Sequence, residues 1–199
     1  MLNEKAAKLS RNALPLQLEN LKKSYSFFRA IYVTDSSYDG QNATCVKMDY
    51  YNKIDAIGID LEGRSHNIQL KAREPGNNDL VFIVRHVTDA DMVRNPHLGF
   101  TFNGEKYSFV LNNIDIFCEM VNGTIYNVLA SDLMALEYDT GGENNPFIKN
   151  VCCQEYINST GNKFRSGNFY AFISPDKIIE LKERLLKAEN RDYYEHTYQ

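Results

Sequence analysis

The chain has 199 residues, of which 43% are hydrophobic and 24% are charged, and its formal net charge is −4. This length and composition suffice for one sizeable hydrophobic core, so we expect a single domain over residues 1–199. The negative net charge does not favour nucleic-acid binding. No apolar run reaches the roughly 18 residues that span a bilayer, so no membrane partner is expected.

The first predicted element is a helix from about residue 12 to residue 30. Pro15 fits its first turn, where the missing N–H costs nothing. An approximate apolar stripe follows the helix, formed by Leu14, Leu18, Leu21 and Phe28. Residues 1–29 also hold six Lys or Arg against two Glu. This basic segment is either a cationic rim around a site or an ordinary solvated helix face.

Short strands are predicted next, at residues 31–33 and 44–48, with turn-forming residues between them. Residues 53–73, KIDAIGIDLEGRSHNIQLKAR, have the pattern of two strands joined by a tight turn. Residues 80–87, LVFIVRHV, have the length and β-branching of a buried strand.

The second half is rich in hairpin signals. Asn-Gly pairs at 103–104 and 122–123 each separate two strand-like runs, the arrangement typical of a two-residue turn. A weaker hairpin signal lies at residues 164–173, and a short helix is expected after Ser131. The last helix begins at Pro175, with Ser174 as its cap. The order of elements predicts an α/β protein of the α+β type, with a central mixed, largely antiparallel sheet and flanking helices.

Polar residues interrupt both strands of the 53–73 hairpin, and the turn decides whether they meet. Gln69 and Lys71 share one face of their strand because side chains alternate. A two-residue turn at 63–64 would place Asp55 on the opposite face. A three-residue turn at 61–63 instead sets Asp55 opposite Gln69, with Lys71 on the diagonal, and puts Gly63 where a left-handed conformation is wanted.

Asp55 followed fourteen residues later by Gln69-Leu70-Lys71 resembles the signature of the PD-(D/E)XK nuclease superfamily, in a QxK variant. In that family an acidic residue on one core strand precedes (Asp/Glu)-x-Lys on the next, behind a helix. The resemblance covers residues 13–87 and implies a restriction-endonuclease-like core. Two departures stand out: Ile54 replaces the proline of the motif, and Gln69 replaces its acid, which removes one negative charge.

The resemblance implies a Mg²⁺ cofactor, with Mn²⁺ as a substitute. Asp55, the Gln69 side-chain oxygen and the Leu70 backbone carbonyl would be the ligands, since Mg²⁺ prefers oxygen. Lys71 would orient or deprotonate the attacking water and stabilise the charge of the transition state. Glu19 on the leading helix is a candidate for a further carboxylate near the metal.

The implied substrate is DNA, with RNA left open. Arg73, on the Lys71 face, and the helix residues Lys22, Lys23 and Arg29 are candidate phosphate contacts. The nuclease-like core would occupy about residues 13–100, and residues 101–199 would add hairpins and a helix for substrate shape or for homodimer contacts. The alternative is a non-catalytic nucleic-acid-binding or protein-assembly module on the same scaffold, which the net charge and the missing acid at position 69 favour.

The spacing of the four cysteines bears on whether the protein is found in a reducing or an oxidising cellular compartment. They include no CxxC pair, so neither a zinc site nor a disulfide framework is indicated. The amino-terminal residues lack the apolar centre of a secretory signal. We therefore expect a cytoplasmic protein with reduced thiols.

Overall fold

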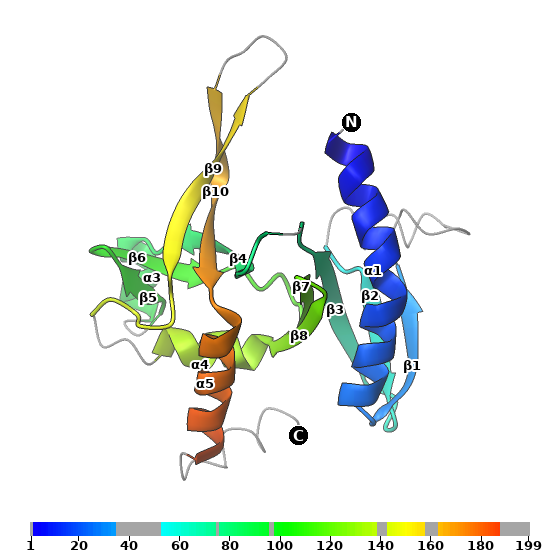
Figure 1. The fold of residues 1–199 in the computed structure, drawn as a ribbon. Helices are drawn as coiled ribbons and strands as arrows, with labels where there is room; N and C mark the ends of the chain where they lie inside the picture. The colour runs from blue at the N-terminus through cyan, green and yellow to red at the C-terminus, as the bar shows by residue number, and fades with distance from the viewer. Residues whose placement is uncertain are drawn as a thin grey trace. The chain divides into compact units, whose positions relative to one another are not determined.

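The structure, a computed structural model, describes residues 2–34, 53–74, 76–95, 98–138, 143–157 and 163–187. The chain divides into two compact units, Met1–Asn78 with Leu111–Ala130 and Asp79–Val110 with Ser131–Gln199. Within the described residues each unit has its own five-stranded sheet (Figure 1). The expected α+β class, with mixed or antiparallel strand pairing and flanking helices, is confirmed, although the described strands form two sheets where one central sheet was expected. The expected strand at 44–48 lies outside the described residues.

The first unit consists of one long helix and a mixed sheet. Its elements are α1 (Leu2–Ser24), β1 (Phe28–Val33), β2 (Ala56–Asp60), β3 (Ser65–Ala72), β7 (Ile116–Val121) and β8 (Thr124–Leu129). The sheet order is β1-β2-β3-β7-β8. The pair β3 and β7 is parallel, and the other neighbours are antiparallel. The strand that carries Gln69 and Lys71 is therefore the central strand of this sheet.

Helix α1 covers one face of the first sheet. Leu21 packs in a buried apolar cluster with strand residues of β2, β3 and β7, namely Ala56, Ile68, Ile116 and Cys118. The helix begins ten residues earlier and ends six residues earlier than predicted, and Pro15 lies inside it rather than in its first turn. Ala13 and Leu14, which directly precede Pro15, are buried, and their packing offsets the hydrogen bond that the proline cannot donate.

The second unit combines an antiparallel sheet with three described helices. Its elements are β4 (Leu80–His86), α3 (Asp89–Arg94), β5 (Phe100–Phe102), β6 (Glu105–Phe109), α4 (Ala130–Tyr138), β9 (Asn150–Ile157), β10 (Lys163–Ile173) and α5 (Pro175–Lys187). The sheet order is β5-β6-β4-β10-β9. The predicted strand at residues 80–87 therefore forms as β4. It does not belong to the sheet of β2 and β3, in which the family resemblance had placed it. The strand that follows β3 in its own sheet is β7.

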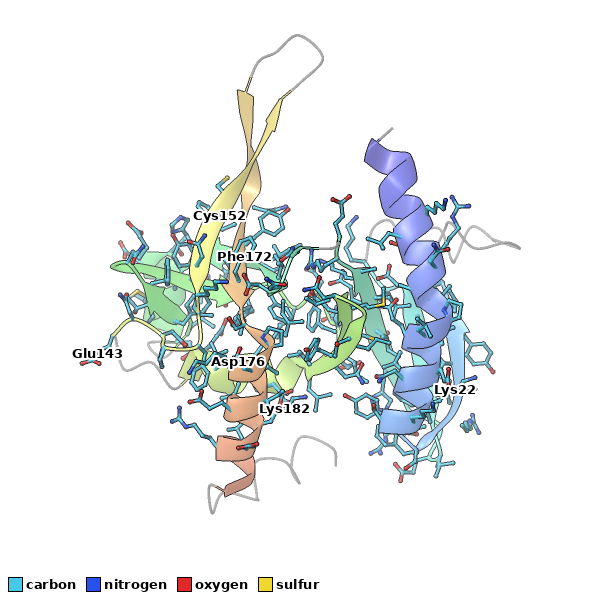
Figure 2. All side chains as sticks on the ribbon, in the orientation of Figure 1. Lys22, Glu143, Cys152, Phe172, Asp176 and Lys182 are labelled. Carbon is cyan, nitrogen blue, oxygen red and sulfur yellow. The ribbon has the colours of Figure 1, made fainter. Side chains whose placement is uncertain are left out.

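Helices α4 and α5 belong to the core of the second unit. Leu133, Leu136, Ile178 and Leu181 are buried, and Lys182, labelled in Figure 2, lies 3.4 Å from the buried Asp132 carboxylate. The predicted positions of both helices are confirmed. Among the described residues, no helix is long and apolar enough to cross a membrane.

The turn predictions succeeded where glycine and asparagine dictate the backbone. Residues 103–104 and 122–123 all have positive φ, between 49° and 80°, as a two-residue hairpin turn of this type requires. The weak hairpin signal at residues 164–173 was wrong. That segment lies within the single strand β10, whose register with β9 shifts between Arg165 and Phe169, so Gly167 marks an irregular stretch of strand rather than a turn.

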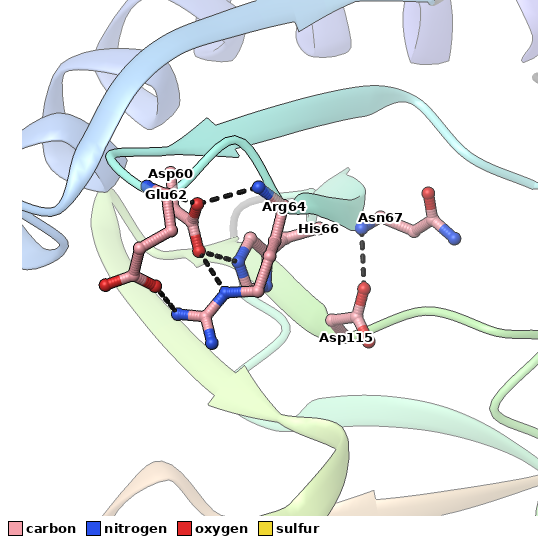
Figure 3. A network of polar contacts seen from close by, with 6 residues as sticks. All are labelled: Asp60, Glu62, Arg64, His66, Asn67 and Asp115. Carbon is pink, nitrogen blue, oxygen red and sulfur yellow. Dashed lines mark hydrogen bonds and ion pairs between the residues drawn. The ribbon is translucent and has the colours of Figure 1, made fainter. Parts of the chain in front are cut away.

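A buried carboxylate fixes the turn between β2 and β3 (Figure 3). Asp60 is 1% exposed, and it accepts hydrogen bonds from the backbone amides of Glu62 and Arg64 at 2.9 and 2.8 Å. The Arg64 Nε lies 2.7 Å and the His66 Nε2 3.2 Å from its Oδ2 atom. Burial alone would raise the pKa of Asp60, but the hydrogen bonds from Arg64 and His66 hold this pKa well below its usual range.

We expect acid to destabilise the protein partly through Asp60. Because its pKa is lower in the folded than in the unfolded chain, its contribution to stability is complete above the unfolded pKa of about 3.9 and is lost as the pH falls through the folded pKa. Asp60→Asn should be less stable than wild type near neutral pH, and its melting temperature should fall less steeply below about pH 4. Thermal melts across this range test the prediction, and parallel curves would contradict it.

Candidate active site

The turn after β2 determines which residues of β2 and β3 face each other. Gly63 has a φ of +86°, a left-handed conformation that glycine adopts without penalty. The Asp60 amide donates to the Arg64 carbonyl at 3.0 Å. The turn is therefore the predicted three-residue form at 61–63, and the two-residue alternative is excluded.

The register that follows from this turn brings Asp55 to β3. Ala56 pairs with Ile68, and the Asp55 amide donates to the Ile68 carbonyl at 2.9 Å. The Asp55 carboxylate, through Oδ2, accepts the Leu70 amide at 2.7 Å. Because the amide and the carbonyl of a strand residue point to the same edge, the Leu70 carbonyl also points toward β2. The acidic residue thus lies against the Gln69-Leu70-Lys71 segment.

Gln69 and Lys71 lie on the face of β3 that α1 does not cover. Ile68 is in the apolar cluster under α1, and Leu70 packs against the same cluster. The alternation of side chains places Gln69 and Lys71 on the other face. The Gln69 amide nitrogen lies 3.4 Å from the Lys53 carbonyl, so the amide oxygen is the atom of this side chain suited to binding a cation.

Charged groups of both signs surround the Lys71 ammonium. Burial lowers its pKa, and the neighbouring cations Arg73 and Lys53 lower it further, whereas the carboxylates of Glu119 and Asp55 raise it. The net effect is a pKa below that of an ordinary lysine. A partly buried lysine whose pKa is perturbed by specific charges is characteristic of functional sites.

Glu119 is a member of this cluster that the sequence analysis missed. It is 1% exposed, it pairs with Lys71 in the parallel register of β3 and β7, and its Oε2 lies 3.0 Å from both Nε and Nη2 of Arg73. Its signal was present in the sequence, since a lone glutamate interrupts the apolar run IDIFCEMV. Arg73, expected to contact phosphate, is thus bound to a carboxylate of the neighbouring strand.

Helix α1 supports the site through a buried glutamine. Gln17 is 2% exposed, and its amide nitrogen donates to the carbonyls of Lys71 and Cys118, both at 2.9 Å. One helix side chain therefore holds β3 and β7 together at the level of Lys71. Burial also raises the pKa of the Cys118 thiol to about 12, so this thiol stays protonated and unreactive near neutral pH.

Glu19 does not join the cluster. Its side chain is 61% exposed and lies 2.6 Å from the ammonium of Lys23. Gln17 and Leu21 face the sheet, and a residue two positions from each points away from it on a helix. The prediction that Glu19 lies near a metal held by Asp55 is therefore wrong.

The basic residues of the amino-terminal segment lie at the other end of the sheet. Phe28 pairs with Asp60, five residues beyond Asp55 and so roughly 17 Å away along the strand at about 3.3 Å per residue. This end carries the last turn of α1 and the start of β1, as Figures 1 and 2 show. The three exposed residues concerned are Lys22, Lys23 and Arg29.

The oxygen atoms of Asp55, Gln69 and Leu70 are of the kind that a hard cation prefers. One carboxylate, one amide oxygen and one backbone carbonyl resemble the sparse ligand set of Mg²⁺, which keeps several waters and binds substrate phosphates as well. Within the described ranges, no three His, Cys, Asp or Glu side chains are grouped as metal ligands. A cation here would therefore depend on neutral oxygens and on its substrate.

Comparisons of this chain with protein-family models, with curated proteins and with solved structures gave no match.

Proposed function

We propose that this protein is a metal-dependent nuclease that hydrolyses phosphodiester bonds in DNA, similar to the PD-(D/E)XK superfamily. The observation that carries the proposal is the hydrogen bond from the Leu70 amide to the Asp55 carboxylate, 2.7 Å long. It joins the acidic residue to the centre of the QxK segment. The order of helix, strand, Asp-bearing strand and QxK strand within one unit supports the same conclusion.

Each residue of the cluster has a role in this chemistry. Asp55, the Gln69 amide oxygen and the Leu70 carbonyl would hold Mg²⁺, or Mn²⁺ in its place. The cation, when bound, polarises a phosphoryl oxygen and neutralises the charge that develops on it. Lys71 would orient or deprotonate the water that attacks phosphorus as the bond to the leaving sugar oxygen breaks. Burial lowers the pKa of Lys71, which is the direction that a base requires.

DNA bound at Lys71 would need to extend along the sheet and around its far end to reach the basic residues Lys22, Lys23 and Arg29, because Lys22 and Lys23 lie on α1, which covers the opposite face. A duplex rises about 3.4 Å per base pair, so the roughly 17 Å between the two ends corresponds to about five base pairs. These residues would therefore contact backbone phosphates beyond the cleaved bond and contribute affinity without base readout.

The direct test is cleavage of nucleic acid by purified protein. Plasmid, linear and single-stranded DNA, together with RNA, would be incubated with Mg²⁺ and with Mn²⁺, beside Asp55→Ala purified in parallel. The proposal expects cleavage that requires the cation and that is lost in Asp55→Ala. Cleavage of equal strength by Asp55→Ala would reveal a contaminant, and a wild type inert under every condition would reject the enzyme.

Gln69→Glu tests whether the cation site is short of negative charge. A glutamate would add a charged ligand at the position where the related motif carries an acid, and ligand charge is a main determinant of cation affinity. We expect Mn²⁺ to bind about tenfold more tightly, a gain of about 1.4 kcal/mol. Calorimetry on both proteins measures it. Unchanged or weaker binding would show that residue 69 does not contact the cation.

The second candidate is a non-catalytic module that binds nucleic acid or assembles with protein. It is favoured by the charge balance of the cluster, in which the carboxylates of Asp55 and Glu119 are matched by Lys71 and Arg73. A balanced cluster attracts a cation less than the acidic site of a metal-dependent enzyme. If neither wild type nor Gln69→Glu binds Mn²⁺ and neither cuts nucleic acid, this candidate replaces the nuclease.

A further inference from the structure

The parallel pairing of β3 with β7 places a second carboxylate beside Lys71. Glu119 is the register partner of Lys71, and residues paired across neighbouring strands have side chains on the same face. Ile116 and Cys118, which lie in the cluster under α1, confirm that Glu119 points to the opposite face. The charge that is missing at position 69 is therefore present on the adjacent strand.

Arg73 holds this carboxylate in place. Two of its guanidinium nitrogens lie 3.0 Å from the same Glu119 oxygen, and its backbone amide donates to the Met120 carbonyl at 2.8 Å. Only 20% of the Arg73 side chain and 1% of the Glu119 side chain are exposed. A guanidinium held through two nitrogens has little freedom to rotate, so the pair keeps a fixed position beside the Lys71 side chain.

We propose that Glu119 and Arg73 form a positioning pair that fixes the Lys71 ammonium beside Asp55 and Gln69 for hydrolysis. The Glu119 carboxylate attracts the ammonium from the β7 side, and the Arg73 guanidinium repels it toward Asp55. The inference rests on the proposed nuclease function and assigns Arg73 a role different from phosphate contact.

Variants of Glu119 and Arg73 can distinguish a positioning role from a purely structural one. Removing one partner of a buried ion pair destabilises a protein because the other charge stays buried, whereas replacing both by neutral groups of similar size is often tolerated. The double variant Glu119→Gln/Arg73→Gln should therefore recover the melting temperature that each single variant loses. Under a structural role it should recover activity as well.

The experiment is a kinetic comparison of wild type, the two single variants and the double variant on one DNA substrate with Mn²⁺. We expect the double variant to melt near the wild-type temperature but to show a kcat about 10- to 100-fold lower, the loss typical for residues that hold metal ligands in place. Its KM should stay within about twofold of wild type, because no substrate contact is removed.

The matched control is Asp132→Asn, which removes the charge of a buried carboxylate paired with Lys182 in the second unit. It should lower the melting temperature and leave kcat unchanged. A double variant with wild-type kcat would overturn the positioning role, and a raised KM with unchanged kcat would overturn it in favour of phosphate contact by Arg73. Both results require active wild type, so they are distinct from failure of the nuclease proposal, in which wild type itself does not cut.

Discussion

Lys71→Met is expected to lower kcat for DNA cleavage by about 10²- to 10⁴-fold, the range that positioned general acids and bases contribute. Methionine retains much of the lysine stem and removes the ammonium, so the variant loses the group that would activate water and balance charge in the transition state. The fold should persist, because burial already disfavours the charged form of this lysine. Mn²⁺ binding should persist as well, since the proposed ligands are untouched.

Steady-state cleavage, thermal melts and Mn²⁺ calorimetry on Lys71→Met together check this result. The control is Lys177→Met, which removes an ammonium from α5 that forms a surface ion pair with Glu180 and should change none of the three measurements appreciably. Lys71→Met that cuts DNA at the wild-type rate would remove Lys71 from the mechanism and leave the QxK segment without a catalytic group.

The fold was predictable wherever the local backbone is dictated by a few residues. Gly63 selected the three-residue turn between β2 and β3, and the Asn-Gly pairs selected the two later hairpins. The pairing of β3 with β7 could not be predicted in this way. The two strands are parallel and separated by more than forty residues, and local pattern carries no record of which distant strand completes a sheet.

The same difference between local turns and distant strand pairing applies to the candidate site. Alternation along the hairpin was enough to predict that Gln69 and Lys71 share a face and that Asp55 reaches them, because Gln69 and Lys71 lie on β3 and Asp55 directly precedes β2, to which β3 is joined by one short turn. Glu119 depends on the register between β3 and β7, so its place beside Lys71 could not be known, although a glutamate within an apolar strand was a visible anomaly.

The prediction for Glu19 was wrong because it did not consider where Glu19 lies around the axis of α1. The apolar stripe suggested by Leu14, Leu18 and Leu21 took no account of Gln17, because a glutamine is seldom expected to be buried. In the structure Gln17 is 2% exposed and is paired with two backbone carbonyls of the sheet. Glu19 lies more than a quarter turn from each of these four residues around the helix, so the stripe itself already placed it on the outward side.

Asp55→Asn is expected to abolish both Mn²⁺ binding and cleavage, which is the largest loss that we predict for a single substitution. Asp55 would be the only charged ligand in the proposed set, since Gln69 and the Leu70 carbonyl are neutral, and an amide brings no net charge to offset the desolvation of a divalent cation. Calorimetry with Mn²⁺ and the plasmid-cleavage assay measure the two losses independently.

Asparagine is preferable to alanine at this position because the Asp55 carboxylate also has a structural role. Its Oδ2 accepts the Leu70 amide at 2.7 Å. The asparagine side-chain oxygen can accept the same hydrogen bond, whereas alanine would leave the amide without this acceptor at a cost of about 1–3 kcal/mol. Asp55→Asn should thus melt closer to wild type than Asp55→Ala does, while both are inactive. If Asp55→Asn retains Mn²⁺ binding with wild-type affinity, the cation is held elsewhere, and Asp55 serves only to close the β2–β3 hairpin.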